Sequence, residues 1–213
     1  MDRIDDLIGE LAGEGARPPG LHPGYRCLVW LCVILVYLAG LSLVLGFRPD
    51  LGQKLAEAPY QLELVFLAAI IVTASLASAW LTLPDLNQQP WIRYLPLVPL
   101  AGFVLLVLAT GKDIGWSGLM AGAAKTSVDC VWHILMFSVP PGLLIFLMMR
   151  QGATVRCCWA GGLATLTVSA FGYLCMRLIE PNDSVAHLLV WHMLPLVVMC
   201  ILGMIAGRFV FRW

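Results

Sequence analysis

The sequence predicts an all-α, polytopic membrane protein with six transmembrane helices and a short amphipathic helix at its N-terminus. Of its 213 residues, 60% are hydrophobic and 12% are charged, which is about half the charged share of a typical soluble domain. Six apolar runs reach, or nearly reach, the roughly 20 residues that cross a bilayer as a helix. We expect these spans near residues 26–46, 62–83, 94–110, 130–149, 157–178 and 187–208.

Residues 2–12 have the pattern of a short amphipathic helix. The apolar residues recur at i, i+3, i+4 and i+7, which places them on one helical face; they are Ile4, Leu7, Ile8 and Leu11. The carboxylates on the other side are Asp5, Asp6 and Glu10. A helix of this length is marginal alone in water, so we expect it to become fully ordered only against something else.

A linker follows this helix, and residues 26–213 then form the transmembrane domain. Residues 13–25 contain four glycines and three prolines, a composition typical of linkers. Helices that lie on membranes normally have a basic polar face, whereas this one is acidic. Its apolar stripe therefore suits the groove of a partner protein, with carboxylates facing basic residues at the rim. The alternatives are a tail that packs on the protein's own loops or stays disordered.

The Lys and Arg residues near the span ends predict that both termini lie in the cytoplasm, since cytoplasmic ends carry the excess of positive charge. With the N-terminus inside, the inner ends carry eight such residues and the outer ends five. The inner set is Arg3, Arg17, Arg26, Arg93, Arg150, Arg156, Arg208 and Arg212. The outer set is Arg48, Lys54, Lys112, Lys125 and Arg177.

Candidate sensing residues gather at the outer ends of the fourth and sixth spans. Cys130 and His133 are i, i+3 neighbours on one helical face, and the loop before the sixth span adds Glu180, Asp183 and His187. Thiolate with imidazole suits zinc, copper(I) or cadmium-like ions, which makes Cys130, His133 and His187 candidate ligands of a regulatory metal. The thiol could instead respond to oxidants, or these could be an ordinary membrane cysteine and a locally bonded histidine.

Several function classes are disfavoured. The net charge is zero and no basic block is present, which argues against direct nucleic-acid binding. No GxSxG, HExxH or P-loop motif occurs, so an enzyme is not indicated. Inside the spans only His192 and Glu63 could ionise, which argues against a proton-coupled transporter. Pro140, Pro141 and Pro195 are expected to kink their helices.

The chain resembles the NrsF-type membrane anti-sigma factors of bacteria, named for negative regulation of sigma F. The resemblance covers nearly the whole chain and rests on short motifs in a fixed order: 5–8, 11–12, 46–51, Cys130, 138–140, 150–154, 181–184 and 212–213. It implies a multi-pass protein of the inner membrane whose N-terminal segment sequesters an extracytoplasmic-function sigma factor. On an envelope, metal or redox stress the sigma factor would be released.

The resemblance also bears on the candidate residues. It implies that the N-terminal helix, Ile4 to Leu11, contacts the sigma factor and that outer cysteines take part in sensing. Cys130 matches one of these cysteines, but Glu180 stands where the second is expected. A mixed site of Cys130, Glu180 or histidines, or a different signal, is then the alternative to a pair of thiols. The competing function is a small transporter or channel for a metal ion or solute that uses Cys130, His133, His187 and His192.

Overall fold

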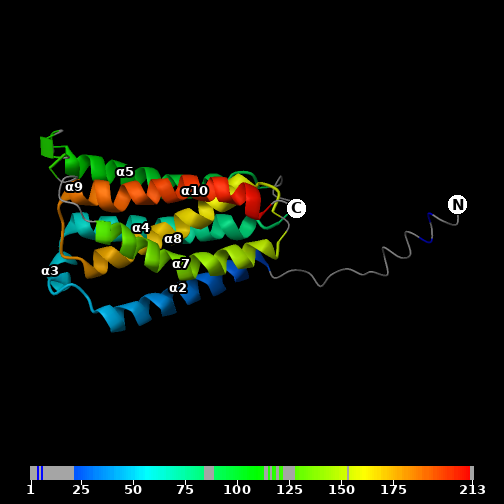
Figure 1. Ribbon diagram of the computed structural model, residues 1–213, viewed down its shortest axis with the longest axis horizontal. Helices are drawn as coiled ribbons and strands as arrows, with labels where there is room; N and C mark the ends of the chain where they lie inside the picture. The colour runs from blue at the N-terminus through cyan, green and yellow to red at the C-terminus, as the bar shows by residue number, and fades with distance from the viewer. Residues whose placement is uncertain are drawn as a thin grey trace.

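The computed structural model confirms an all-helical protein with six membrane-length helices over the residues that it describes, namely 4, 6, 22–83, 89–112, 115, 117, 118, 120, 121, 128–152 and 154–211. The first three spans are α2 (Pro23–Leu45), α4 (Ala58–Trp80), and η2 (Ile92–Tyr94) continuing into α5 (Leu97–Gly111). The last three are α7 (Val128–Arg150), α8 (Cys157–Ile179), and the run of α9 (Val185–His187), η3 (Leu188–Met193) and α10 (Leu194–Val210). A short helix, α3 (Leu51–Lys54), joins α2 to α4 (Figure 1).

The expected spans agree closely with the observed helices. The largest difference is at α4, which begins at Ala58 where the apolar run predicts a start at 62. Helix α2 begins at Pro23, inside the expected linker, because proline is favoured in the first turn of a helix and Nδ1 of His22 accepts a 3.1 Å hydrogen bond from the backbone N–H of Gly24. Helix α7 continues through Pro140 and Pro141.

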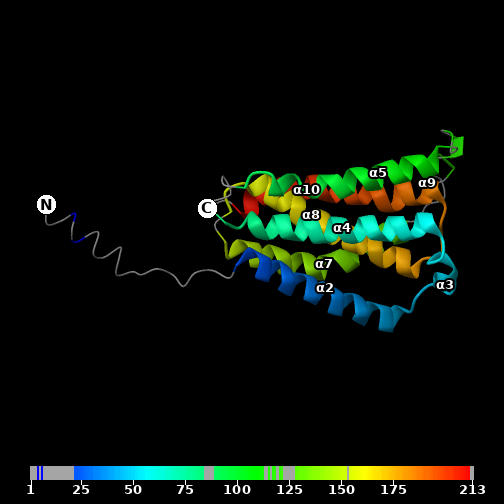
Figure 2. The ribbon, with the colours of Figure 1, turned by 180° about the vertical axis from the view of Figure 1, so that it is seen from behind.

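Helix α8 is the centre of the bundle, with α4, α7 and α10 packed around it (Figure 2). Of its membrane-length window 83% is buried, against 11% for α2, so α8 faces protein on nearly all sides. Close approach to α10 depends on glycines, since small residues let helix backbones come close together. A Cβ added at Gly161 would meet the carbonyl oxygen of Gly203 and Cα of Gly207.

The two ends of the bundle differ in charge. Helix α2 starts and α10 finishes at one end, the terminal end, whereas α3 and α9 lie at the other, the distal end (Figure 1). Between residues 22 and 211, every carboxylate that the structure describes belongs to the distal end. Five arginines lie at the terminal end: Arg26, Arg93, Arg150, Arg156 and Arg208.

Of the predicted N-terminal helix, only Ile4 and Asp6 are among the described residues; both are helical and exposed. The other predicted sigma-factor contacts (Asp5, Leu7, Ile8, Glu10 and Leu11) lie outside the described part of the chain, as do 13–21 of the linker.

Candidate functional site

Four side chains from three segments meet at the distal end and form what we call the Cys–Glu–His cluster: Cys130, Glu180, His187 and His192. The Cys130 Sγ lies 3.4 Å from both carboxylate oxygens of Glu180 and 3.6 Å from Nε2 of His187. Nε2 of His187 lies 3.2 Å from Oε1 of Glu180, and Nε2 of His192 lies 3.1 Å from Oε2. One ligand atom from each residue lies within 4.8 Å of the others.

The two histidines share this site because the helix between them is not a regular α-helix. At 3.6 residues per turn, residues five apart point about 140° away from each other. Residues Leu188–Met193 instead form a π-helix, and the N–H of Leu194 donates to the carbonyl of Leu189, five residues earlier. Pro195 lacks the N–H that would restore the usual pattern at the next residue. The wider turn brings His187 and His192 to one face, with ring centroids 5.1 Å apart.

The cluster is largely shielded from solvent. Cys130, His187 and His192 are 7%, 3% and 0% exposed, and the Nδ1 atom of His192 is buried with no hydrogen-bond partner in the described part of the chain. Burial opposes ionisation of Glu180, but the hydrogen bond from His192, the electrostatic interaction with that ring and the hydrogen bond from Cys130 outweigh it and lower the pKa of this carboxyl. The carboxylate is therefore the anionic centre of the cluster.

His133, a predicted ligand, is not part of the cluster. Its Nδ1 lies 2.6 Å from the carbonyl oxygen of Asp129, one turn earlier, and its ring is exposed. It does line a surface hollow whose wall also includes Asp129, Cys130 and Glu180. His133 therefore lies at the surface beside the cluster. As the shared helical face predicts, Cys130 and His133 both line this hollow.

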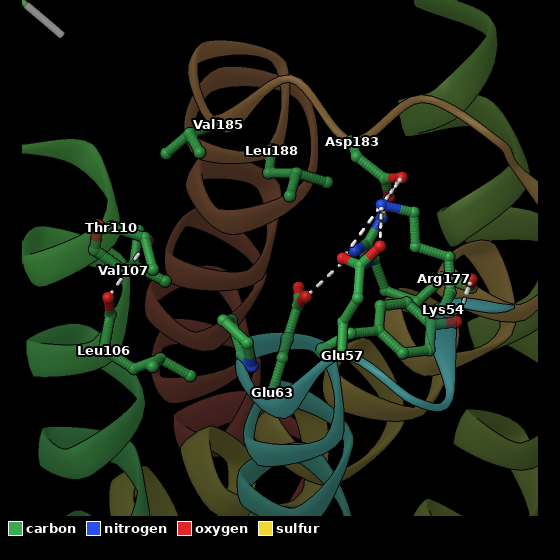
Figure 3. A pocket seen from close by; sticks show the side chains of 12 residues that line it. Lys54, Glu57, Glu63, Leu106, Val107, Thr110, Arg177, Asp183, Val185 and Leu188 are labelled. Carbon is green, nitrogen blue, oxygen red and sulfur yellow. Dashed lines mark hydrogen bonds and ion pairs between the residues drawn. The ribbon is translucent and has the colours of Figure 1, made fainter. Parts of the chain in front are cut away.

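Asp183 belongs to a neighbouring group, the charged cluster, which comprises Arg48, Asp50, Lys54, Glu63, Arg177 and Asp183. Arg48 is 2% exposed and donates two hydrogen bonds to Asp183, of 2.9 and 2.8 Å, and two to Asp50, of 2.7 and 2.8 Å. Lys54 and Arg177 also reach Asp183, at 3.1 and 2.9 Å. Of this cluster, Lys54, Glu63, Arg177 and Asp183 line a pocket between α4, α5 and α9 (Figure 3).

Tyr173 lies between the two clusters. Its hydroxyl donates a 2.7 Å hydrogen bond to Glu63, which is itself 3.0 Å from Arg177. The Tyr173 ring makes an edge contact with His192, with centroids 5.1 Å apart. On the other side, Glu180 and Asp183 lie on the same short turn between α8 and α9. The two clusters are therefore linked twice: by Tyr173 of α8, which contacts a member of each, and by the turn that carries Glu180 and Asp183.

The predicted sensing set is Cys130, His133, Glu180, Asp183 and His187. The structure brings Cys130, Glu180 and His187 within contact distance and places His133 and Asp183 outside the cluster. His192 was predicted only as an ionisable residue of the sixth span and as part of the transporter alternative. Its i, i+5 spacing from His187, with Pro195 following, was an available signal. The roles of Arg48, Glu63 and Tyr173 were missed. Residues 48–50 could have suggested the pair of Arg48 with Asp50 at the end of the first span. The second partner of Arg48, Asp183, is 135 residues away along the chain and has no local signal.

Comparison with known proteins gives two matches. The family described as "Negative regulator of sigma F" matches residues 11–213. The chain is also similar to a protein of Caulobacter vibrioides described as "Anti-sigma-F factor NrsF", with 27% identity over 224 aligned residues that cover 99% of this chain and all of the relative. No solved structure matches. These matches confirm the resemblance expected from the sequence, although the family match starts at residue 11 and leaves most of the N-terminal helix outside it.

Proposed function

Because the chain belongs to the negative regulator of sigma F family, we propose that it is a membrane anti-sigma factor for an extracytoplasmic-function sigma factor. It holds the sigma factor through its N-terminal segment and releases it when a stress acts on the distal end of the bundle. Beyond the family, one observation carries this proposal. The first span, which follows the N-terminal segment, begins at the terminal end of the bundle, whereas Cys130, Glu180, His187 and His192 meet at the distal end.

The orientation follows from the charges. The terminal end carries five arginines with no described carboxylate between residues 22 and 211, and cytoplasmic ends of spans are enriched in Lys and Arg. Both termini then lie in the cytoplasm of a bacterial cell, where sigma factors act, and the Cys–Glu–His cluster lies at the outer face of the inner membrane. Arg48 and Arg177, the cations of the distal end that are most buried, are each paired with carboxylates.

The N-terminal segment supplies the binding surface. Its apolar stripe would enter a groove of the sigma factor, with Leu7 and Leu11 as central anchors. Its carboxylates would steer a basic partner and set its register, since charges at an interface rim act mainly on encounter and specificity. Ile4 and Asp6, the two described residues of this segment, are exposed and so available for such contacts.

Release requires that the signal favour the sigma-free state. A signal with equal affinity for both states shifts nothing, and a change from mostly bound to mostly free needs about 5 kcal/mol of differential binding. Helix α8 is the natural route, because it runs from Glu180 at the distal end to Cys157 at the terminal end and contacts α4, α7 and α10. A small shift of α8 would change its packing against all three of these helices.

The test is co-purification of sigma factors with the tagged full-length protein from detergent-solubilised membranes, identified by mass spectrometry. We expect Leu7→Asp and Leu11→Asp to abolish co-purification while the protein still inserts. Gly9→Asp is the matched control, since it adds the same charge on the opposite helical face and should retain the sigma factor. Unchanged co-purification with both leucine variants would contradict the proposal, and a protein that functions without residues 1–12 would favour the transporter alternative.

A further inference from the structure

We propose that Cys130, Glu180, His187 and His192 form a closed, four-ligand binding site for a divalent cation of the zinc class. The site goes beyond the proposed function, and only its role as the stress input rests on that function. Three observations carry the proposal: the spacing of the ligand atoms, the balance of charge among them, and the irregular helix that brings them together.

The spacing fits tetrahedral zinc. With Zn–S near 2.3 Å and Zn–N and Zn–O near 2.0–2.1 Å, the edges of the ligand tetrahedron are about 3.3–3.6 Å long. The edges between Sγ of Cys130 and the oxygens of Glu180 are 3.4 Å, and the edge to Nε2 of His187 is 3.6 Å. The two oxygens of Glu180 each face one imidazole: Oε1 lies 3.2 Å from Nε2 of His187, and Oε2 lies 3.1 Å from Nε2 of His192. One ligand atom from each residue lies within 4.8 Å of the others, so the longest separations would shorten by about 1 Å as the four atoms close around an ion.

The charges fit a divalent ion. A thiolate and a carboxylate supply two negative charges, and two neutral imidazoles supply none, so a bound divalent cation gives a neutral site. Neutrality matters because three of the four residues are buried, and an uncompensated buried charge is costly. Binding displaces the thiol proton of Cys130 to solvent, since metals bind thiolate rather than thiol. Each neutral imidazole that binds through Nε2 then carries its one proton on Nδ1.

The ligand types select the metal class. One sulfur, one oxygen and two imidazole nitrogens are the ligands that zinc uses in proteins, and a site with four protein ligands and no open position is typical of structural or regulatory zinc rather than catalytic zinc. Copper(I) prefers sulfur-rich sites, and magnesium and calcium prefer oxygen. The hollow lined by Asp129 and His133 gives the ion a route to the thiol.

The helix geometry is the third support. A π-helical turn is less favourable than a regular one and is found frequently at functional sites. Here the π-helix of residues 188–193 places His187 and His192 on one face. Without it, the two imidazoles would diverge and the carboxylate of Glu180 could not reach both.

The direct test uses the full-length protein in detergent, stripped with a chelator and reloaded with Zn²⁺ or Co²⁺. We expect one equivalent of Zn²⁺ to stay bound through gel filtration. With Co²⁺ we expect the absorption of a tetrahedral ion and a thiolate-to-cobalt charge-transfer band. Cys130→Ser and His192→Gln should each weaken Zn²⁺ binding by more than about 100-fold. Loss of a group that only hydrogen-bonds to a ligand already weakens metal binding by up to that factor, and the loss of a ligand should cost more. Cys32→Ser, on α2 and outside the cluster, is the control and should bind as the parent does.

A second measurement needs no substitution. Saturating Zn²⁺ should slow alkylation of Cys130 by iodoacetamide several-fold, read by peptide mass spectrometry, and leave Cys158, at the terminal end of α8, unaffected. Failure of the parent protein to retain Zn²⁺, or equal alkylation rates with and without it, would overturn the site. Sigma-factor co-purification is measured on the same preparations: metal binding without a sigma factor would contradict only the proposed function, and a sigma factor without metal binding only this site.

Discussion

Arg48 and Asp183 form a two-bond ion pair across 135 residues of sequence, with N–O distances of 2.9 and 2.8 Å. The Arg48 side chain is fully buried, whereas that of Asp183 is 28% exposed. Arg48 also donates its backbone N–H to the carbonyl oxygen of Leu178, at 2.9 Å. This one residue therefore ties the loop after α2 to the distal end of α8.

We expect Arg48→Gln to destabilise the protein by about 3 kcal/mol, because removing one member of a buried ion pair leaves its carboxylate partners uncompensated. The measurement is thermal unfolding in detergent micelles. Lys54→Gln is the control: Lys54 pairs with the same Asp183 but is more exposed, so its loss should cost about 1 kcal/mol or less. Equal effects of the two substitutions would show that burial of Arg48 does not strengthen the pair.

The ion pair also predicts a pH dependence. Hydrogen bonds from Arg48, and then from Lys54 and Arg177, outweigh burial and lower the pKa of Asp183 below its usual 3.8. A carboxyl whose pKa is lower in the folded state stabilises the fold above the unfolded pKa, and this contribution is lost as the pH falls toward the folded pKa. The difference in melting temperature between the parent and Asp183→Asn should thus be constant above about pH 5 and shrink below about pH 4. A difference that grew on acidification would contradict this assignment.

Close packing of α8 on α10 predicts a strong effect at Gly161. An added Cβ would meet backbone atoms of Gly203 and Gly207, which cannot move aside as a flexible side chain can. We expect Gly161→Ala to destabilise the protein by about 1–3 kcal/mol, the usual cost of overpacking. Gly40→Ala on α2 is the matched control, since nothing lies within 4 Å of its added Cβ, and it should not lower the melting temperature.

The π-helix predicts a separable effect on metal binding. Pro195→Ala restores a backbone N–H that can donate to an earlier carbonyl, which favours a regular α-helix through residues 188–193. His192 would then rotate away from His187 and Glu180. We expect Co²⁺ binding to weaken at least about tenfold, with the melting temperature of the metal-free protein unchanged or higher. Loss of folding would instead mean that the π-helix is required for the fold.

The sequence was sufficient for the fold, because apolar runs of membrane length admit only helices where backbone groups cannot bond to water. It was less informative for the site. Cys130, Glu180 and His187 were found because each lies at the end of a predicted span. His192 was joined to Cys130 and His187 only in the transporter alternative, since residues at i and i+5 lie on different faces of a regular α-helix. The pairing of Arg48 with Asp183 depends on how α2 and α8 pack, which no local pattern records. The N-terminal sigma-factor contacts stay a prediction.

The turn between α8 and α9 supplies Glu180 to one cluster and Asp183 to the other, with only Pro181 and Asn182 between them. Its length is therefore fixed by two sets of partners at once. Among related proteins we expect this turn to tolerate changes of residue type but not insertions or deletions, since one added residue would turn either carboxylate away from its partners. A substitution at position 180 should also be accompanied by changes at 187 or 192, because these residues contact one another in the Cys–Glu–His cluster.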